Sequence, residues 1–222
     1  MNILAGYGLL LAYFLVIFFI AGWLIKKFFG VAVSRKAIHI FVGFAWFIYD
    51  QFFGNSYHGM IICGALLLVA ILSKKFHLIK SIENDKSNSN GTIYYASALF
   101  VLFLIGYLVP DLYPYVGFAV IILSVGDGAA MLFGRFIKSI KIYHEKTLIG
   151  FLSCIALTFG SIALYNFFYF NAFSWIQLIL IAILAGIFEE EDLNGFDNIT
   201  ISLFSFGVMA LIKYVPEVDV TI

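Results

Sequence analysis

The sequence predicts an all-α protein, a polytopic membrane helix bundle of about seven or eight transmembrane helices within a single integral-membrane domain (residues 1–222). Its composition is 63% hydrophobic and only 12% charged, with a mean hydropathy of +1.03. Soluble domains average about 45–50% apolar and about 25% charged residues. The apolar residues also gather in runs close to the ~20 residues that a helix needs to cross a bilayer.

Eight apolar segments follow one another along the chain. They run over residues 3–25, then over about 34–53, 57–73, 91–109, 112–133, 148–170, 174–188 and 199–215. Several are short, so seven spans with a tilted or re-entrant segment is an alternative to eight. We expect the first segment to be a retained span, because no basic residue precedes it and it exceeds the ~7–15-residue core of a signal peptide.

The basic residues predict an orientation. Of the 13 Lys and Arg residues, all but Lys213 fall between spans one and two, three and four, or five and six. Short cytoplasmic loops are enriched in Lys and Arg, so these loops should be cytoplasmic and both termini outside. The compact length and the lack of targeting extensions favour a bacterial plasma membrane over an endoplasmic reticulum.

Charge and cysteine usage exclude several classes of protein. The 13 basic residues are balanced by 13 acidic ones, so the chain lacks the basic excess of a nucleic-acid-binding protein. Cys63 and Cys154 both lie in apolar runs without a histidine at ligand spacing, which excludes a disulfide scaffold and a structural zinc site. No feature of the sequence fixes an oligomeric state.

Asp127 is the strongest functional signal, because an ionisable residue inside an apolar span is costly. Gly126 and Gly128 flank it and allow the backbone to unwind or a ligand to approach. On a continuous helix Asp127 shares a face with Gly134 and Arg135, but the two charges stand roughly 12 Å apart. An ion pair that ties helices together is the bland interpretation. A metal ion with phosphates between the two charges would also account for both.

A second cluster, Arg35, Lys36 and His39, opens the second span. Arg35 and His39 are four residues apart, so a helix places them on one face. One interpretation is a basic anchor followed by a hydrogen-bonded histidine. The other is a site for an anion or a hydroxyl, since a histidine just inside the membrane needs a polar partner.

The loop between spans five and six supplies further basic and small residues. Lys141 and Lys146 add positive charge, while Thr147 and Gly150 offer a hydroxyl and backbone N–H groups to an anion at the start of span six. The alternative is a loop that only orients the protein or binds anionic lipid headgroups.

An acidic segment, residues 189–198, follows span seven. Glu189, Asp197 and Asn198 offer the carboxylate and amide oxygens that Mg²⁺ prefers. Asp197 or Asn198 alternatively caps the last span. For Glu190 and Glu191 a solvated acidic loop is the favoured interpretation.

Together these clusters resemble the CTP-dependent lipid-alcohol kinases, which include phytol and farnesol kinases, dolichol kinase and the fungal-type diacylglycerol kinase. The resemblance extends from about residue 34 to residue 203. The motifs that carry it are Arg35-Lys36-x-x-His39, Gly91-Thr92-x-Tyr94-Tyr95, Gly126-Asp127-Gly128-x-Ala130-x-x-x-Gly134-Arg135, Lys146-Thr147-x-x-Gly150, Glu189, and Gly195-x-Asp197-Asn198-x-Thr200.

The resemblance implies transfer of the γ-phosphoryl group of CTP, favoured over ATP, to a long-chain alcohol embedded among membrane lipids. It implies an Mg²⁺ cofactor held by Asp127 and Asp197 with help from Asn198 and Glu189. His39 is the candidate for accepting the substrate hydroxyl proton, with Asp127 as the rival base. The nucleotide and phosphate site would comprise Arg35, Lys36, Gly126, Gly128, Gly134, Arg135, Lys141, Lys146, Thr147 and Gly150.

Two alternatives remain from the sequence. A CTP-dependent phosphatidate cytidylyltransferase shares the basic loop and the late acidic motif, but the long Asp-and-His signature expected near its C-terminus is absent. A small cation or metabolite transporter would use Asp127 and the acidic segment as a path. A transporter would also need polar groups in the outer half of the bundle, where the sequence offers few.

Overall fold

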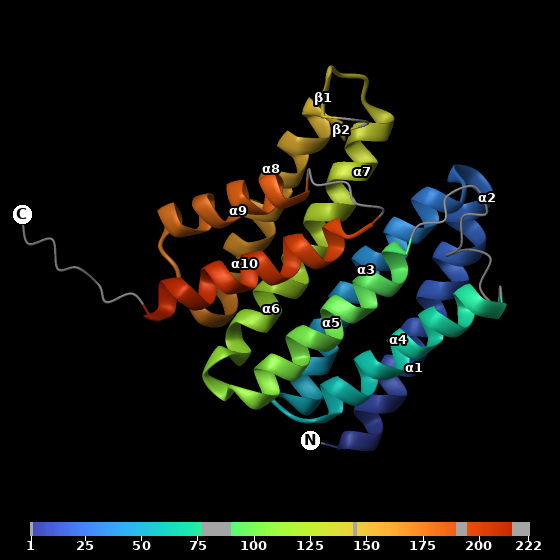
Figure 1. Ribbon diagram of the computed structural model, residues 1–222. Helices are drawn as coiled ribbons and strands as arrows, with labels where there is room; N and C mark the ends of the chain where they lie inside the picture. The colour runs from blue at the N-terminus through green and yellow to red at the C-terminus, as the bar shows by residue number, and fades with distance from the viewer. Residues whose placement is uncertain (1, 77–89, 144–145, 190–194, 215–222) are drawn as a thin grey trace, which may run out of the picture.

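Helices account for nearly all of the regular structure in the computed structural model, which describes residues 2–76, 90–143, 146–189 and 195–214 (Figure 1). The α-helices are α1 (Ile3–Phe19), α2 (Lys26–Phe29), α3 (Val31–Phe53), α4 (His58–Phe76), α5 (Gly91–Leu108), α6 (Tyr113–Ile121), α7 (Asp127–Phe136), α8 (Leu148–Tyr165), α9 (Trp175–Glu189) and α10 (Asp197–Tyr214).

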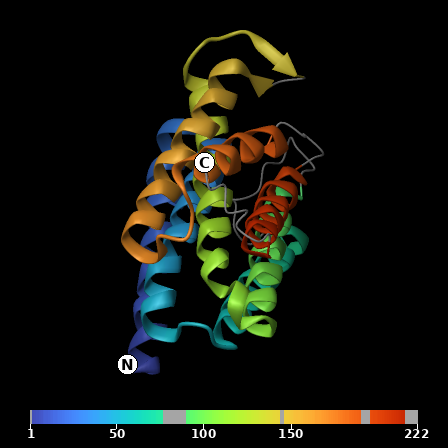
Figure 2. The same ribbon diagram turned by 90° about the vertical axis from the view of Figure 1, so that its left-hand side faces the viewer.

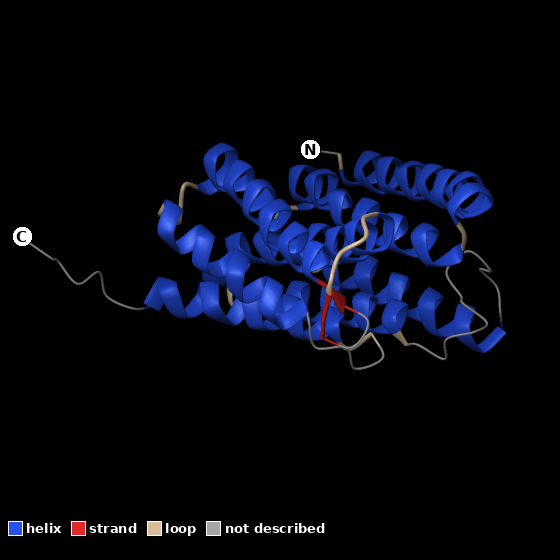
Figure 3. Cartoon of the chain, turned by 90° about the horizontal axis from the view of Figure 1, so that it is seen from above, coloured by secondary structure: helices blue, strands red, loops and turns tan. Residues whose placement is uncertain are grey.

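Shorter elements join or extend these helices. Three π-helical segments continue α1, α6 and α8, one 3₁₀ turn precedes α6, and two short antiparallel strands pair before α8. These elements are η1 (Ile20–Ile25), η2 (Pro110–Leu112), η3 (Ile122–Gly126), η4 (Asn166–Phe170), β1 (Lys141–Tyr143) and β2 (Lys146–Thr147). Figure 3, seen from above, shows the two strands in red among the blue helices.

Six helical stretches within the described residues are long and apolar enough to cross a membrane, which is the pattern of an integral membrane protein. They are Ile3–Phe29, Val31–Phe53, His58–Phe76, Gly91–Leu108, Pro110–Phe136 and Leu148–Phe170. The remaining two predicted segments form α9, an apolar helix of 15 residues, and α10, which carries Asp197 in its first turn and Lys213 in its last. The predicted all-α membrane bundle is confirmed, with six helices that meet the length and composition required.

Several helices extend past the predicted span ends into the basic segments. The first continues through Lys26 and Lys27 and stops at Gly30, whose φ of +85° few other residues tolerate. α4 likewise includes Lys74 and Lys75. Apolar runs mark the bilayer core, whereas a helix can continue into the interface, so hydropathy alone underestimates helix length.

The helical stretch Pro110–Phe136 forms the centre of the bundle. In its most apolar window 78% of the residues are buried, against 12% for the first helix. Small residues let neighbours approach: a Cβ on Gly117 would stand 2.1 Å from the Tyr165 hydroxyl and 2.6 Å from the Trp46 ring. Trp46 donates a hydrogen bond to that hydroxyl at 3.0 Å, which satisfies the indole N–H inside the core.

The two ends of the bundle differ in charge. The N-terminus of α1 lies at one end, and the β1–β2 pair lies at the other (Figures 1 and 2), so we call these the N-terminal end and the hairpin end. Basic residues from α2, from the first turns of α3 and from the end of α7 lie towards the hairpin end. The cytoplasmic location of this end stays a prediction of the positive-inside pattern.

Candidate functional site

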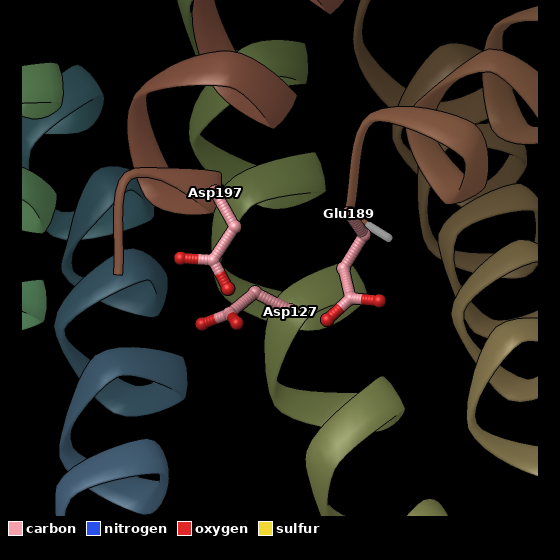
Figure 4. A group of neighbouring side chains, drawn as sticks. All are labelled: Asp127, Glu189 and Asp197. Carbon is pink, nitrogen blue, oxygen red and sulfur yellow. The ribbon is translucent and has the colours of Figure 1, made fainter. Parts of the chain in front are cut away.

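Three carboxylates from three helices meet inside the protein towards the hairpin end (Figure 4). Asp127 is the first residue of α7, Glu189 the last of α9, and Asp197 the first of α10. Each contributes a ligand oxygen within 4.8 Å of the other two, and the residues are only 1%, 2% and 7% exposed. Three carboxylates this close in a low-dielectric setting are stable only with positive charge among them or with a carboxyl group protonated.

A π-helical turn and a glycine with positive φ set the directions of two of these side chains. Asp127 follows the π-helical turn η3, so its direction is shifted relative to the α6 portion of the same helix. Asp197 follows Gly195, whose φ of +94° turns the chain into α10. The Asp197 Oδ1 atom accepts hydrogen bonds from the backbone N–H and the side-chain amide of Asn198, at 3.0 and 3.1 Å. One carboxylate oxygen of Asp197 is thereby fixed.

Two lysines supply positive charge to the cluster. Lys36, from α3, donates to Asp127 Oδ1 in a buried ion pair. Lys146, from β2, pairs with Glu189, donates to the Glu189 backbone oxygen at 2.7 Å, and lies 3.9 Å from Asp197 Oδ2. Burial lowers the pKa of Lys146, but Glu189 and Asp197 outweigh this effect and raise its pKa above the ordinary value. With all five groups ionised, the cluster retains one net negative charge.

Oxygen atoms without partners complete the cluster. Among the described residues, Asp127 Oδ2, Glu189 Oε2 and Asn198 Oδ1 are buried and make no hydrogen bond. A buried acceptor left unpaired costs about 1–3 kcal/mol. Hard divalent cations bind carboxylate and amide oxygens, so these atoms suit the predicted Mg²⁺ in their chemistry, and the binding of Mg²⁺ stays a prediction.

Next to the carboxylates lies a set of neutral polar side chains, His39, Tyr95 and Ser124, which we call the polar layer. The His39 ring stacks on Tyr95 with centroids 4.1 Å apart, and the residue is 2% exposed. The Tyr95 hydroxyl donates to the His39 backbone oxygen at 2.7 Å and lies 2.9 Å from Ser124 Oγ. Both His39 ring nitrogens are buried without a partner within the described residues. The imidazole therefore has hydrogen-bonding capacity that no described residue uses.

The predicted phosphate-site glycines lie at close helix contacts. A Cβ on Gly126 would stand 2.7 Å from Thr158 Oγ1, and one on Gly128 would stand 2.4 Å from Ile40. Both positions therefore serve helix packing. Their predicted contact with nucleotide stays a prediction.

Thr147, Gly134 and Gly150 form a second close contact, at the start of α8. Thr147 Oγ1 accepts from the Gly150 N–H at 3.2 Å and so caps the helix. A Cβ on Gly134 would stand 2.8 Å from this same hydroxyl. Thr147 and Gly150 thus already satisfy each other in this structure, and their predicted role in phosphate binding stays a prediction.

The other predicted basic residues lie farther out. Arg35 is half-buried, whereas Arg135 and Lys141 are exposed. The ion-pair partner of Asp127 is Lys36, so the bland interpretation that Asp127 pairs with Arg135 is replaced by a different pair. The segment with Glu190 and Glu191 lies outside the described residues.

Sequence reasoning assigned Lys36 and Lys146 to phosphates and missed their ion pairs with carboxylates. A signal was available, because a carboxylate inside a bundle needs a nearby cation and both lysines stand beside the predicted site. It also missed the polar layer as a unit. Tyr95 and Ser124 carry no charge, and a tyrosine in an apolar run is common in a membrane helix.

In comparisons with known proteins, no family model, no curated protein and no solved structure matches the chain. Any functional assignment therefore rests on the chemistry of the site itself.

Proposed function

We propose that the protein is a membrane-embedded lipid kinase, which transfers the γ-phosphoryl group of CTP, or less favourably ATP, to the hydroxyl of a long-chain lipid alcohol. The observation that carries this proposal is the buried group of Asp127, Glu189 and Asp197, with unpaired oxygens and two lysines beside it. Phosphoryl transfer depends mainly on positioning and on neutralising phosphate charge, and these residues are suited to both tasks.

Each set of residues in the site has a proposed role that its position supports. Asp127, Glu189, Asp197 and Asn198 would hold Mg²⁺, which when bound neutralises charge on the phosphate oxygens. Lys36 and Lys146 lie against the same carboxylates and add positive charge at that point. The exposed Arg135 and Lys141 suit the solvent-facing part of a nucleotide.

The polar layer supports a route for the proton that the substrate hydroxyl loses. His39 has two unused ring nitrogens and lies three residues from Lys36 on α3, about one helical turn from the carboxylates. A substrate hydroxyl there would donate its proton to the imidazole as the phosphoryl group arrives. Asp127, whose Oδ2 atom is unpaired, is the rival base.

The location of the site favours a lipid substrate. The carboxylates lie inside a bundle of membrane helices and towards one of its ends, where a lipid hydroxyl resides. The basic residues of this end favour the cytoplasmic side, and we extend this to the cytoplasmic face of a bacterial plasma membrane.

The test is label transfer by the purified protein in lipid nanodiscs with Mg²⁺. CTP labelled at the α or the γ phosphate is offered with phytol, farnesol, a polyprenol, diacylglycerol or phosphatidate. We expect γ label on an alcohol, lost when Mg²⁺ is chelated. Label from the α position on phosphatidate would instead indicate a cytidylyltransferase. Absence of transfer from both CTP and ATP would contradict the enzyme proposal and favour a transport function.

A further inference from the structure

The two lysines of the candidate site divide the carboxylate oxygens into two sets. Asp127 accepts a hydrogen bond from Lys36 on Oδ1, while its Oδ2 atom has no partner among the described residues. Glu189 accepts from Lys146 on Oε1, and its Oε2 atom is likewise unpaired there. Each carboxylate thus has a lysine on one oxygen and the other oxygen available. A divalent cation on the available oxygens would therefore lie close to two ammonium groups.

The charge of the cluster makes this closeness important. Three carboxylates and two ammonium groups carry one net negative charge when all are ionised, and carboxylates that bind a metal are ionised. A divalent cation would turn this into one net positive charge inside the protein. A buried charge without compensation is costly. Cation binding to this cluster is therefore more favourable together with an anion than alone.

The lysines also indicate where such an anion would bind. In both ion pairs the lysine is the more exposed partner: the side chain of Lys146 is 18% exposed against 3% for Glu189, and Lys36 and Asp127 follow the same order. An ion that arrives from solvent thus meets the ammonium groups before the carboxylates. A lysine has a flexible stem and three N–H donors, so it can turn from a carboxylate towards a phosphate oxygen.

We propose that Lys36 and Lys146 act as internal cations that keep Mg²⁺ weakly bound on its own, so that the site takes up Mg²⁺ together with a phosphate group; this rests on the proposed function. The lysines repel a lone divalent cation and attract the phosphate that accompanies it. Three carboxylates without the lysines would instead bind free divalent cations more tightly. The site consequently fills when a nucleotide arrives and discriminates against free metal ions.

The first experiment measures binding to the wild-type protein and requires no turnover. Mg²⁺ is titrated by calorimetry into protein in phosphatidylcholine nanodiscs, with and without inorganic phosphate, and affinities are referred to the free ion concentrations. We expect phosphate to lower the Kd of Mg²⁺ by about 5–150-fold, and Mg²⁺ to lower the Kd of phosphate by the same factor, because such coupling is reciprocal. A Kd of Mg²⁺ that is the same with and without phosphate would overturn the proposal.

The second experiment removes one of the two positive charges. Lys146→Gln keeps an N–H donor for Glu189 but no charge. Mg²⁺ alone should bind about tenfold or more tightly to this variant, since a divalent cation and an ammonium group a few ångströms apart repel by about that factor even in bulk water. Phosphate, with Mg²⁺ present, should bind about tenfold more weakly. A lysine with only a structural role would weaken both, so changes in the same direction, or no change, would overturn the proposal.

Three further variants control for folding and for general charge effects. Lys36→Gln removes a charge from the other side of the cluster and should give the same opposite changes, which keeps the test decisive if Lys146→Gln does not fold. Lys146→Arg retains the charge and should retain weak binding of Mg²⁺ alone. Lys213→Gln removes a charge at the N-terminal end and should match wild type for both ions. A change in Lys213→Gln as large as that in Lys146→Gln would contradict the role of the site lysines.

The two proposals fail in different ways. A wild-type protein that binds no Mg²⁺, with or without phosphate, would contradict the metal site and with it both proposals. Tight binding of Mg²⁺ alone, together with γ-phosphoryl transfer, would keep the kinase and overturn the role of the lysines. Coupled binding of Mg²⁺ and phosphate without transfer to any alcohol would support the role of the lysines and contradict the kinase.

Discussion

Each end of the bundle holds a lysine–aspartate pair, and the two pairs differ in burial. At the hairpin end Lys36 pairs with Asp127, and their side chains are 11% and 1% exposed. At the N-terminal end Lys213 lies 4.0 Å from Asp111, with side chains 28% and 80% exposed. Lys213 also donates to the Asp111 backbone oxygen at 2.7 Å.

The difference in burial distinguishes an ordinary surface contact from a pair that needs a further explanation. An exposed pair contributes about 0–1 kcal/mol, so the Lys213 pair needs no explanation beyond local structure. A buried pair loses hydration that its own attraction seldom repays, and the Asp127 pair stands beside two further carboxylates. Stability alone does not account for such a group, and the proposed binding of a cation and phosphates would account for it. Burial, more than pairing, thus distinguishes the charges of the candidate site from those of the surface.

The largest expected effect is on activity. Asp127→Asn should lower the proposed γ-phosphoryl transfer by about 10²–10³-fold or more, because it removes charge at the proposed metal site. Asparagine keeps an oxygen for Lys36, so the protein should still fold, as size-exclusion chromatography would show. Asp111→Asn is the matched control and should retain wild-type rates. Equal phosphoryl-transfer rates in the two variants would show that the two lysine–aspartate pairs do not differ in function.

The second effect concerns cation binding, and it is measured without substrate. Mg²⁺ at about one hundred times its Kd should stabilise the wild-type protein by about 2.7 kcal/mol, seen as a higher Tm. Glu189→Gln removes the negative charge of a carboxylate that has a buried, unpaired oxygen, and it should largely abolish this Tm shift. Asp111→Asn should keep the Tm shift. A Mg²⁺ shift that persists in Glu189→Gln would remove this residue from the metal site.

A third, smaller effect tests the helix contact beneath the site. A Cβ on Gly43 would stand 1.8 Å from Ser124 Oγ, so Gly43→Ala should separate α3 from η3 and cost roughly 1–3 kcal/mol of stability. Gly160, where a Cβ meets nothing within 4 Å, provides the control, and Gly160→Ala should leave Tm unchanged or slightly raised. Thermal unfolding in one detergent compares the two. A Gly43→Ala protein as stable as wild type would show that this contact can relax.

The smallest effect belongs to the exposed pair. Lys213→Met should change stability by less than about 1 kcal/mol and leave phosphoryl transfer unaltered, because solvent screens that pair. Urea or thermal unfolding together with the transfer assay measures both quantities. A marked loss of activity in this variant would mean that the N-terminal end also takes part in function.

The sequence allowed the helices and the main acidic residues to be predicted for clear physical reasons. Apolar runs near the thickness of a bilayer define spans, and an acid within such a run is conspicuous, which identified Asp127. Glu189 and Asp197 were found because oxygen ligands gather in one short segment. The structure brings all three together, although nothing in the sequence gives the distances between them.

Other features depend on contacts between distant parts of the chain. Lys36 and Asp127 are separated by 91 residues, and Tyr95 and His39 by 56, so no local pattern reports either contact. Arg135 shares a predicted helix face with Asp127, yet it ends exposed because α7 runs out of the bundle. A glycine beside an acid suits ligand approach and helix packing equally, and the sequence alone does not show that Gly128 lies against Ile40.

The π-helical turn η3 gives the central helix two separate rotational phases. An α-helix advances about 100° per residue, and a turn that holds an extra residue shifts everything beyond it by that amount. The α6 part of the helix can thus keep its apolar packing while the α7 part directs Asp127 towards Lys36. Loss of Leu123 alone from η3 would restore one phase and turn the carboxylate away from the cluster, with every side chain of the candidate site still present in the sequence.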